Sequence, residues 1–253
     1  MDLDAYLARI GHAGPRDVNA ETLRALHRAH LETVPFENLD IHLGRPIVLN
    51  EAALFEKIVG RRRGGFCFEL NGLFAALLRE LGFAVSLLSA RVVGKDGALA
   101  PEFDHLTLLV ETEGRWLADV GFGDGFTEPL CLDGAGPQRR GDSEYRLARR
   151  DGDWRMAARP PGGPWRDRYQ FSLTPRRLAD FTAMCDHHQT SADSHFTQSR
   201  VCSRRRDGRL LTLTDDRLVE TTAAGRQEQP IADERAFGAA LANDFGIEMS
   251  EVE

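Results

Sequence analysis

Cys67 is the residue of this sequence best suited to act as a nucleophile. It ends the run Arg63-Gly64-Gly65-Phe66-Cys67, directly before an apolar segment with helical spacing. A cysteine at a helix N-terminus lies among free backbone N–H groups and near the positive end of the helix dipole, and both stabilise a thiolate. The two glycines would let the chain turn tightly into the helix. We therefore predict a nucleophilic cysteine here; the alternative is a buried, unreactive thiol.

Two further residues have the chemistry to activate this thiol. His105 opens a predicted strand, 105–111, and Asp119 lies near the end of the next one, 115–120. If these strands pair in antiparallel fashion, the carboxylate can fix the imidazole tautomer and stabilise the imidazolium. The alternatives are a histidine that only packs in the core, an Asp119 bonded to nearby backbone amides, and Asp124 in the place of Asp119.

The elements that must position these residues change character along the chain. Apolar residues at helical spacing predict helices in the first third, with Asn19 and Asn50 as N-caps and Gly82 after the helix that starts near Cys67. Period-two alternation then predicts strands, at 83–93, 105–111, 115–120, 145–149, 154–158, 169–173, 210–214 and 218–222. Further helices are predicted after Thr174-Pro175 and over 233–245. Helices followed by antiparallel strands and a mixed end indicate an α+β fold.

The composition restricts the class of protein. The chain has 253 residues, of which 42% are hydrophobic and 28% charged, with a formal net charge of -7. No stretch approaches about 18 uninterrupted apolar residues, and the N-terminus lacks the features of a signal peptide. We therefore expect a cytoplasmic protein without a membrane span. The acidic balance argues against nucleic-acid binding, and we interpret the arginine runs 61–63 and 204–206 as solvated, paired charge.

The cysteine pattern argues against a metal site. None of the four cysteines forms a C-x-x-C pair, and we expect free thiols, three of them packing residues. Cys185 and its neighbours His187, His188 and His195 match no standard ligand spacing, so we expect no metal. The papain signature C-G-[SA]-C-[WY] is also absent.

Five segments together resemble the arylamine N-acetyltransferase family. They are Val34-Pro35-Phe36-Glu37-Asn38-Leu39, the Arg-Gly-Gly-Phe-Cys run ending at Cys67, Asp104-His105-Leu106, Asp119-Val120-Gly121-Phe122-Gly123 and Gln189-Thr190-Ser191-Ala192-Asp193-Ser194-His195-Phe196. The last looks like the family's T-S-P-x-S-x-F stretch, with Ala192 in place of the usual proline. The resemblance runs from the N-terminus to at least Phe196.

The resemblance implies a cysteine-proteinase-like core in three parts. A helical bundle, 1–82, would carry the nucleophile, and a central antiparallel β-barrel, 83–175, would carry the histidine and the aspartate. An α/β lid would follow over 176–253.

The resemblance also assigns roles to individual residues. It implies a catalytic triad of Cys67, His105 and Asp119, and an aromatic acceptor pocket bordered by Phe36 and Phe122, which suits a flat aromatic amine.

Two further pairs follow from the same resemblance. Asp193 and Ser194 lie where the family contacts coenzyme A, although Ala192 changes that loop. Glu37 and Arg63 resemble the family's structural ion pair; by themselves they look like surface charges.

The implied activity is an acetyl-CoA-dependent N-acetyltransferase acting on arylamines, arylhydrazines or arylhydroxylamines. Its mechanism would be ping-pong through an acetyl-cysteine, with acetyl-CoA as donor substrate and no metal. Three alternatives remain: an amide synthase that releases a carrier-bound polyketide thioester onto an aromatic amine, a transglutaminase- or peptidase-like thiol enzyme, and a non-catalytic binding module.

Overall fold

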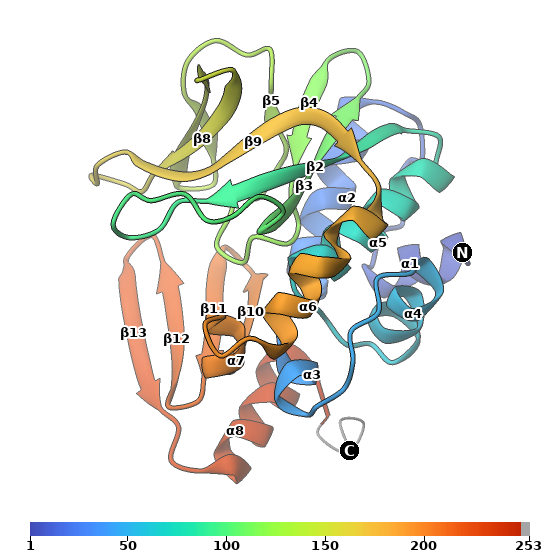
Figure 1. The fold of residues 1–253 in the computed structure, drawn as a ribbon. Coiled ribbons are helices and arrows are strands. Elements are labelled where there is room, and N and C mark those ends of the chain that lie inside the picture. Colours follow the sequence, from blue (N-terminus) through green and yellow to red (C-terminus); the bar gives the residue numbers. More distant parts are fainter. Residues whose placement is uncertain (249–253) are drawn as a thin grey trace.

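The computed structural model describes residues 1–248 and has an α+β architecture. The strands form an eight-stranded, barrel-like sheet and a five-stranded sheet. Figure 1 shows the larger sheet at the top, the smaller one below it, and most helices on one side of both. Within residues 1–248, no helix is both long and apolar enough to cross a membrane. The predicted fold class is confirmed.

Helices occupy the N-terminal third, as predicted. They are α1 (Leu3–Arg9), α2 (Ala20–Thr33), α3 (Leu39–His42), α4 (Glu51–Phe55), a π-helical turn (Glu56–Gly60) and α5 (Cys67–Glu80). The side chains of Asn19 and Asn50 cap α2 and α4, accepting hydrogen bonds from the amides of Thr22 at 2.8 Å and Ala53 at 2.9 Å. Both predicted caps are confirmed.

Helix α5 is buried on nearly every side. Its side chains are buried almost without interruption as far as Leu78, and it packs against β2 and β3. The sequence predicted one apolar face, whereas the structure buries nearly every residue of the helix, including the polar Glu69 and Asn71. The first residue of the most deeply buried helix is therefore Cys67.

The barrel-like sheet is antiparallel throughout, in the order β5-β4-β3-β2-β9-β8-β7-β6. Its strands are β2 (Ala84–Val92), β3 (His105–Glu111), β4 (Arg115–Ala118), β5 (Leu130–Cys131), β6 (Gln138–Arg140), β7 (Ser143–Arg150), β8 (Asp153–Arg159) and β9 (Arg166–Arg176). A side chain joins its two edges, because the Gln138 amide bonds the backbone N–H and C=O of Cys131 at 2.7 and 2.8 Å.

The helix predicted after Thr174-Pro175, through Leu178, Phe181 and Met184, is confirmed, and it begins at Leu178. Strand β9 continues to Arg176, and Pro175 lies opposite Leu88, next to a register shift in β2. Proline is tolerated at such strand irregularities because its missing N–H is not needed there. Helical structure begins only with a 3₁₀ turn (Leu178–Phe181) that leads into α6 (Thr182–Thr190).

The five-stranded sheet completes the chain and has the order β1-β10-β11-β12-β13. Its elements and the helices around it are β1 (Phe36–Glu37), α7 (His195–Gln198), β10 (Val201–Arg206), β11 (Arg209–Thr214), β12 (Arg217–Thr222), β13 (Gly225–Pro230), α8 (Glu234–Ala240) and a π-helical turn (Leu241–Phe245). The hairpin predicted over 210–222 is confirmed. Strands β10 and β13 were not predicted.

One large hydrophobic core spans the helices and the inner strands. It contains residues of α1, α2 and α5 together with residues of β2, β3 and β4, and it also includes Phe181 and Cys185. The helical segment and the sheet therefore stabilise each other. The division into 1–82, 83–175 and 176–253 stays a prediction.

Candidate active site

Cys67 lies at the edge of a large cavity. It is the first residue of α5, and the preceding Phe66 N–H donates to the Glu69 carboxylate at 3.0 Å. The cavity has a volume of about 1230 Å³, and its walls include Cys67 and His105. Cys67 is 4% exposed, and it lines this cavity.

The glycines before Cys67 serve close packing, which corrects the predicted turn. Neither has a positive φ; the left-handed residue of this loop is Arg62, with φ 52°. A Cβ on Gly64 would lie 1.9 Å from the carbonyl oxygen of Pro35. Gly64 therefore allows the loop to press against the segment before β1.

His105 and Asp119 are in direct contact. His105 is the first residue of β3. The predicted strand 115–120 included Asp119, but the observed strand β4 ends one residue earlier, at Ala118. His105 Nε2 and Asp119 Oδ2 are 2.7 Å apart, and both side chains are almost fully buried. If Nε2–H donates to the carboxylate, Nδ1 is left to accept a proton.

Asp119 is held by donors that the sequence did not reveal. The Asn71 amide donates to Oδ1 at 2.8 Å, and the Gly121 N–H donates to the same oxygen at 3.1 Å. Burial alone would raise the pKa of Asp119, but His105 and these hydrogen bonds lower it below its usual value. The carboxylate therefore stays ionised. The rival interpretation of Asp119 as a partner of local amides is correct as well, since it makes both contacts.

A second buried histidine, His27 of α2, holds the backbone of Asp119. Its Nε2 lies 3.2 Å from the Asp119 amide nitrogen, and its Nδ1 lies 3.1 Å from the Thr127 carbonyl oxygen. Burial lowers the pKa of His27 to about 4. The neutral ring can thus donate from Nδ1 and accept at Nε2. No local sequence signal identified this contact between distant segments.

Gly121 brings the loop after Asp119 against the start of α5. A Cβ on Gly121 would lie 2.8 Å from Cys67 Cα and 3.0 Å from the Cys67 carbonyl oxygen. Real Cβ atoms do not approach backbone this closely, so only glycine fits. This contact links the backbone that carries the aspartate to the backbone that carries the cysteine.

The helix N-terminus does not by itself make Cys67 a thiolate. Burial raises the pKa of this thiol well above its usual value, Asp104 and Asp119 add to the rise, and the Leu106 backbone only partly offsets it. Burial thus opposes the stabilisation of a thiolate that is expected from the helix N-terminus. A thiolate at Cys67 requires a cation beside it, and protonated His105 is the candidate.

A buried ion cluster lies beside the cysteine loop. It consists of Glu37, Asp40, Lys57, Arg63 and Glu69, all at most 4% exposed. Arg63 Nη2 contacts Glu37 Oε1 at 2.8 Å, and Lys57 Nζ contacts both Asp40 Oδ2 and Glu69 Oε1 at 2.8 Å. The interpretation of Arg63 as a solvated charge is thus wrong, whereas the Glu37–Arg63 pair is present.

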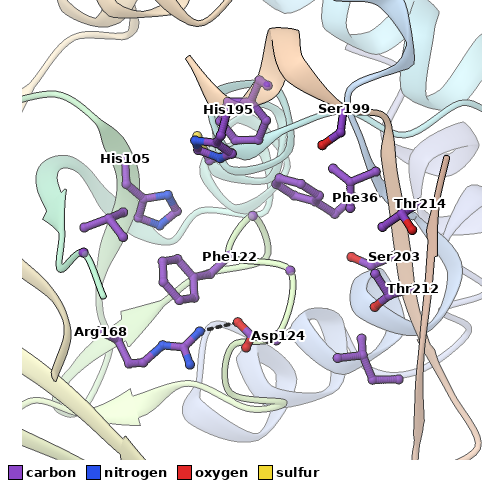
Figure 2. Close-up of a pocket in the computed structure, with 18 of the residues that line it drawn as sticks. Phe36, His105, Phe122, Asp124, Arg168, His195, Ser199, Ser203, Thr212 and Thr214 are labelled. Atoms are coloured by element: carbon purple, nitrogen blue, oxygen red, sulfur yellow. Dashed lines mark hydrogen bonds and ion pairs between the residues drawn. The ribbon is translucent and has the colours of Figure 1, made fainter. Parts of the chain in front are cut away.

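Aromatic side chains form the wall of the cavity near the cysteine. Figure 2 shows Phe36 and Phe122 pointing into it from opposite sides, with His105 next to Phe122. The rings of His105 and Phe122 have centroids 5.1 Å apart, and Tyr169 packs against both. The far wall is polar and comes from the second sheet, with Ser203, Thr212 and Thr214.

The remaining candidate residues are placed differently. Asp193 is exposed, and Ser194 is buried with its hydroxyl 3.2 Å from His188 Nδ1; neither is among the residues that line the cavity, although His195 and Phe196 are. Their contact with coenzyme A stays a prediction.

Asp124, the alternative to Asp119, lies in the cavity wall and pairs with Arg168 instead of His105. Among residues 1–248, no three His, Cys, Asp or Glu side chains are grouped to hold a metal ion. All four cysteines are free thiols.

Comparisons with known proteins agree with this geometry. The family model described as N-acetyltransferase matches residues 19–253. The chain is 38% identical to the arylamine N-acetyltransferase of Escherichia coli strain K12 over 97% of this chain and 88% of that protein. It is 36% identical to the arylamine N-acetyltransferase of Mycolicibacterium smegmatis over 100% of this chain and 94% of that one.

Solved structures give the same result. The Mycobacterium marinum arylamine N-acetyltransferase in complex with CoA superposes with a TM-score of 0.93 at 33% identity, covering 100% of this chain and 95% of that one. The enzyme from Salmonella typhimurium has a TM-score of 0.90 at 36% identity, covering 96% of this chain and 90% of that one. The chain therefore belongs to the arylamine N-acetyltransferase family, and it is an acyltransferase.

Proposed function

We propose that the protein transfers the acetyl group of acetyl-CoA to aromatic amines, hydrazines or hydroxylamines through an acetyl-Cys67 intermediate. The observation that carries this proposal is the 2.7 Å contact between buried Asp119 and His105, which lines the same cavity as Cys67. A thiol, a base and a carboxylate that orients the base are the parts of an activated nucleophile.

In the first half-reaction, the Cys67 thiol gives its proton to His105 Nδ1. The thiolate attacks the carbonyl carbon of acetyl-CoA, and the backbone N–H of Cys67 stabilises the oxyanion. The coenzyme A sulfur leaves with the electron pair of the broken thioester and takes the proton from His105. Asp119 stabilises the imidazolium throughout, because its lowered pKa keeps it charged.

In the second half-reaction, an aromatic amine enters the same cavity and packs against Phe122 and Phe36. Its nitrogen attacks the acetyl-cysteine carbonyl while His105 accepts the amine proton. The Cys67 thiolate leaves, and His105 returns a proton to it. The complex of the Mycobacterium marinum relative with CoA supports coenzyme A as the donor's leaving group, and the cavity of about 1230 Å³ exceeds the usual pocket for one small ligand.

Initial rates at varied acetyl-CoA and arylamine concentrations test the scheme. A ping-pong reaction predicts parallel double-reciprocal lines, and a Cys67→Ala variant should show no turnover. Intersecting lines would contradict the covalent intermediate. Turnover only with a carrier-bound thioester would identify an amide synthase, and transfer to or hydrolysis at peptide glutamine would identify a transglutaminase- or peptidase-like enzyme.

A further inference from the structure

His188 is a buried histidine that the proposed reaction does not use. It belongs to α6, its side chain is 5% exposed, and it lines the same cavity as Cys67 and His105. His188 Nε2 lies 3.3 Å from the carbonyl oxygen of Asp104 and 3.4 Å from the Asp104 carboxylate. Asp104 directly precedes His105, the first residue of β3. His188 therefore contacts the backbone from which the proposed base extends.

The same ring also packs against the two residues that flank Cys67. Its centre lies 5.9 Å from that of Phe68 in a stacked arrangement and 6.4 Å from that of Phe66 in an edge-to-face arrangement. Aromatic rings at these separations attract one another. Both phenylalanines are completely buried, so packing fixes their positions on every side. One side chain thus joins the start of α5, which carries Cys67, to the start of β3, which carries His105.

The hydroxyl of Ser194 sets the direction in which His188 donates. Ser194 is buried, and its Oγ lies 3.2 Å from His188 Nδ1 and accepts from the Phe196 N–H at 3.3 Å. The hydroxyl can therefore use both of its functions, accepting from Phe196 and donating to Nδ1. A neutral ring that accepts at Nδ1 carries its proton on Nε2 and donates it to Asp104. The other neutral tautomer would place an unprotonated Nε2 against two acceptor oxygens.

We propose that His188 is a positioning residue that holds His105 where it can take the proton of Cys67, and that Ser194 orients the His188 ring. Neither residue forms or breaks a bond in the reaction. Ser194 is not among the residues that line the cavity, so this role differs from a contact with coenzyme A. The inference rests on the proposed function, because it concerns the transfer of a proton from Cys67 to His105.

The rate of Cys67 acetylation at increasing acetyl-CoA concentrations tests the inference, measured by rapid quenching and intact-protein mass spectrometry. His188→Phe keeps an aromatic ring but loses both hydrogen bonds, and it should lower the maximal rate about tenfold, because small displacements of reacting groups are costly. Its half-saturating acetyl-CoA concentration should stay within about twofold of the parent value. His188→Gln, whose side-chain amide can donate to Asp104, should restore most of the rate. His187→Phe is the matched control, since His187 is the exposed neighbour on the same helix, and it should leave the rate unchanged.

Ser194→Ala separates the two possible roles of the serine. If Ser194 orients His188, this variant should lower the maximal rate about three- to fivefold through the loss of one hydrogen bond. A contact with coenzyme A alone would instead raise the half-saturating acetyl-CoA concentration and leave the maximal rate unchanged. That second result would overturn the inference.

Alkylation of Cys67 by iodoacetamide gives a readout that does not depend on substrate contacts with His188. Because the thiolate is the reacting form, the rate in His188→Phe should fall as it does for acetylation, while that of the partly exposed Cys131 in the same sample stays constant. A fall in acetylation alone, or a slow rate that His188→Gln does not restore, would overturn the inference. Should His188→Phe not fold, Ser194→Ala decides by the criterion above. A parent that acetyl-CoA does not acetylate would contradict the proposed function itself, whereas normal acetylation in every variant would contradict only the role of His188.

Discussion

Lys57 lies within the buried ion cluster, and its replacement by methionine should strongly destabilise the protein. The cluster holds three carboxylates and two cations, with Lys57 Nζ at 2.8 Å from Asp40 Oδ2, 2.8 Å from Glu69 Oε1 and 3.9 Å from Glu37 Oε1. Burial would lower the pKa of Lys57, but the three carboxylates more than offset it, so the lysine is charged. Methionine keeps most of the apolar stem and removes only this charge.

The size of the loss follows from the charges left behind. Breaking a buried ion pair by removing one partner costs about 3–5 kcal/mol, because the remaining charge is neither paired nor solvated. In a protein of this size, each kcal/mol corresponds to about 2–4 °C in Tm. We therefore expect Lys57→Met to lower Tm by about 6–20 °C at pH 8. Protonation of Glu69, whose pKa is raised to about 6 by burial, should reduce the loss at pH 5.

Chemical and thermal unfolding at both pH values provide the measurement. Lys95→Met is the matched control, because Lys95 is the only other lysine of the chain and is exposed. Adding Glu69→Gln to Lys57→Met should recover part of the stability by removing one unpaired charge. A Lys57→Met variant as stable as Lys95→Met at pH 8 would refute the assignment of a charged, buried cluster.

Three further predictions concern the neighbouring groups. Burial raises the pKa of Glu69 to about 6, although Lys57 partly offsets the rise. The ionised Glu69 therefore lowers the free energy of unfolding by about 2 kcal/mol. This loss is absent below about pH 4.5 and complete above about pH 7. Glu69→Gln should thus gain stability relative to the parent as the pH rises from 5 to 7, and a parallel pH profile in unfolding experiments would contradict this. Asp119→Asn should slow acetyl transfer by a factor on the order of 10³–10⁴, because an amide that donates to His105 Nε2 places the imidazole proton on Nδ1. Rates of acetylation measured in quenched reactions test this. A decrease in rate of less than tenfold would argue against the assigned tautomer. Gly121→Ala should reduce kcat/KM by at least about tenfold, because its Cβ would collide with the backbone of Cys67. The circular dichroism spectrum should stay unchanged. Full activity would show that the contact between Gly121 and Cys67 does not position the site.

The chemistry of the site was more predictable than the groups that support it. Cys67 was identified by its place before a helix, and His105 and Asp119 by strands that the alternation pattern indicated. Asn71 and His27 were missed because their partners are distant along the chain, at Leu106, Asp119 and Thr127. A buried asparagine or histidine carries no periodic signal that names its partner.

The errors in the fold have similar physical causes. Strand β13 is exposed along its whole length, so it has no alternation of apolar and polar residues to detect. Strand β10 contains Arg204, Arg205 and Arg206, which look like a solvated charge run although Arg204 and Arg205 are half-buried. The role of Gly64 was misread because a sequence shows that a glycine is present but not which backbone approaches it.

The formation of acetyl-Cys67 is the central claim, and intact-protein mass spectrometry tests it most directly. The protein is mixed with acetyl-CoA alone, beside Cys67→Ala and beside Cys131→Ala, in which a partly exposed cysteine is removed instead. We predict one added acetyl group on the parent and on Cys131→Ala, none on Cys67→Ala, and loss of the adduct when an arylamine is added. An unmodified parent, or an adduct that persists in Cys67→Ala, would contradict the account.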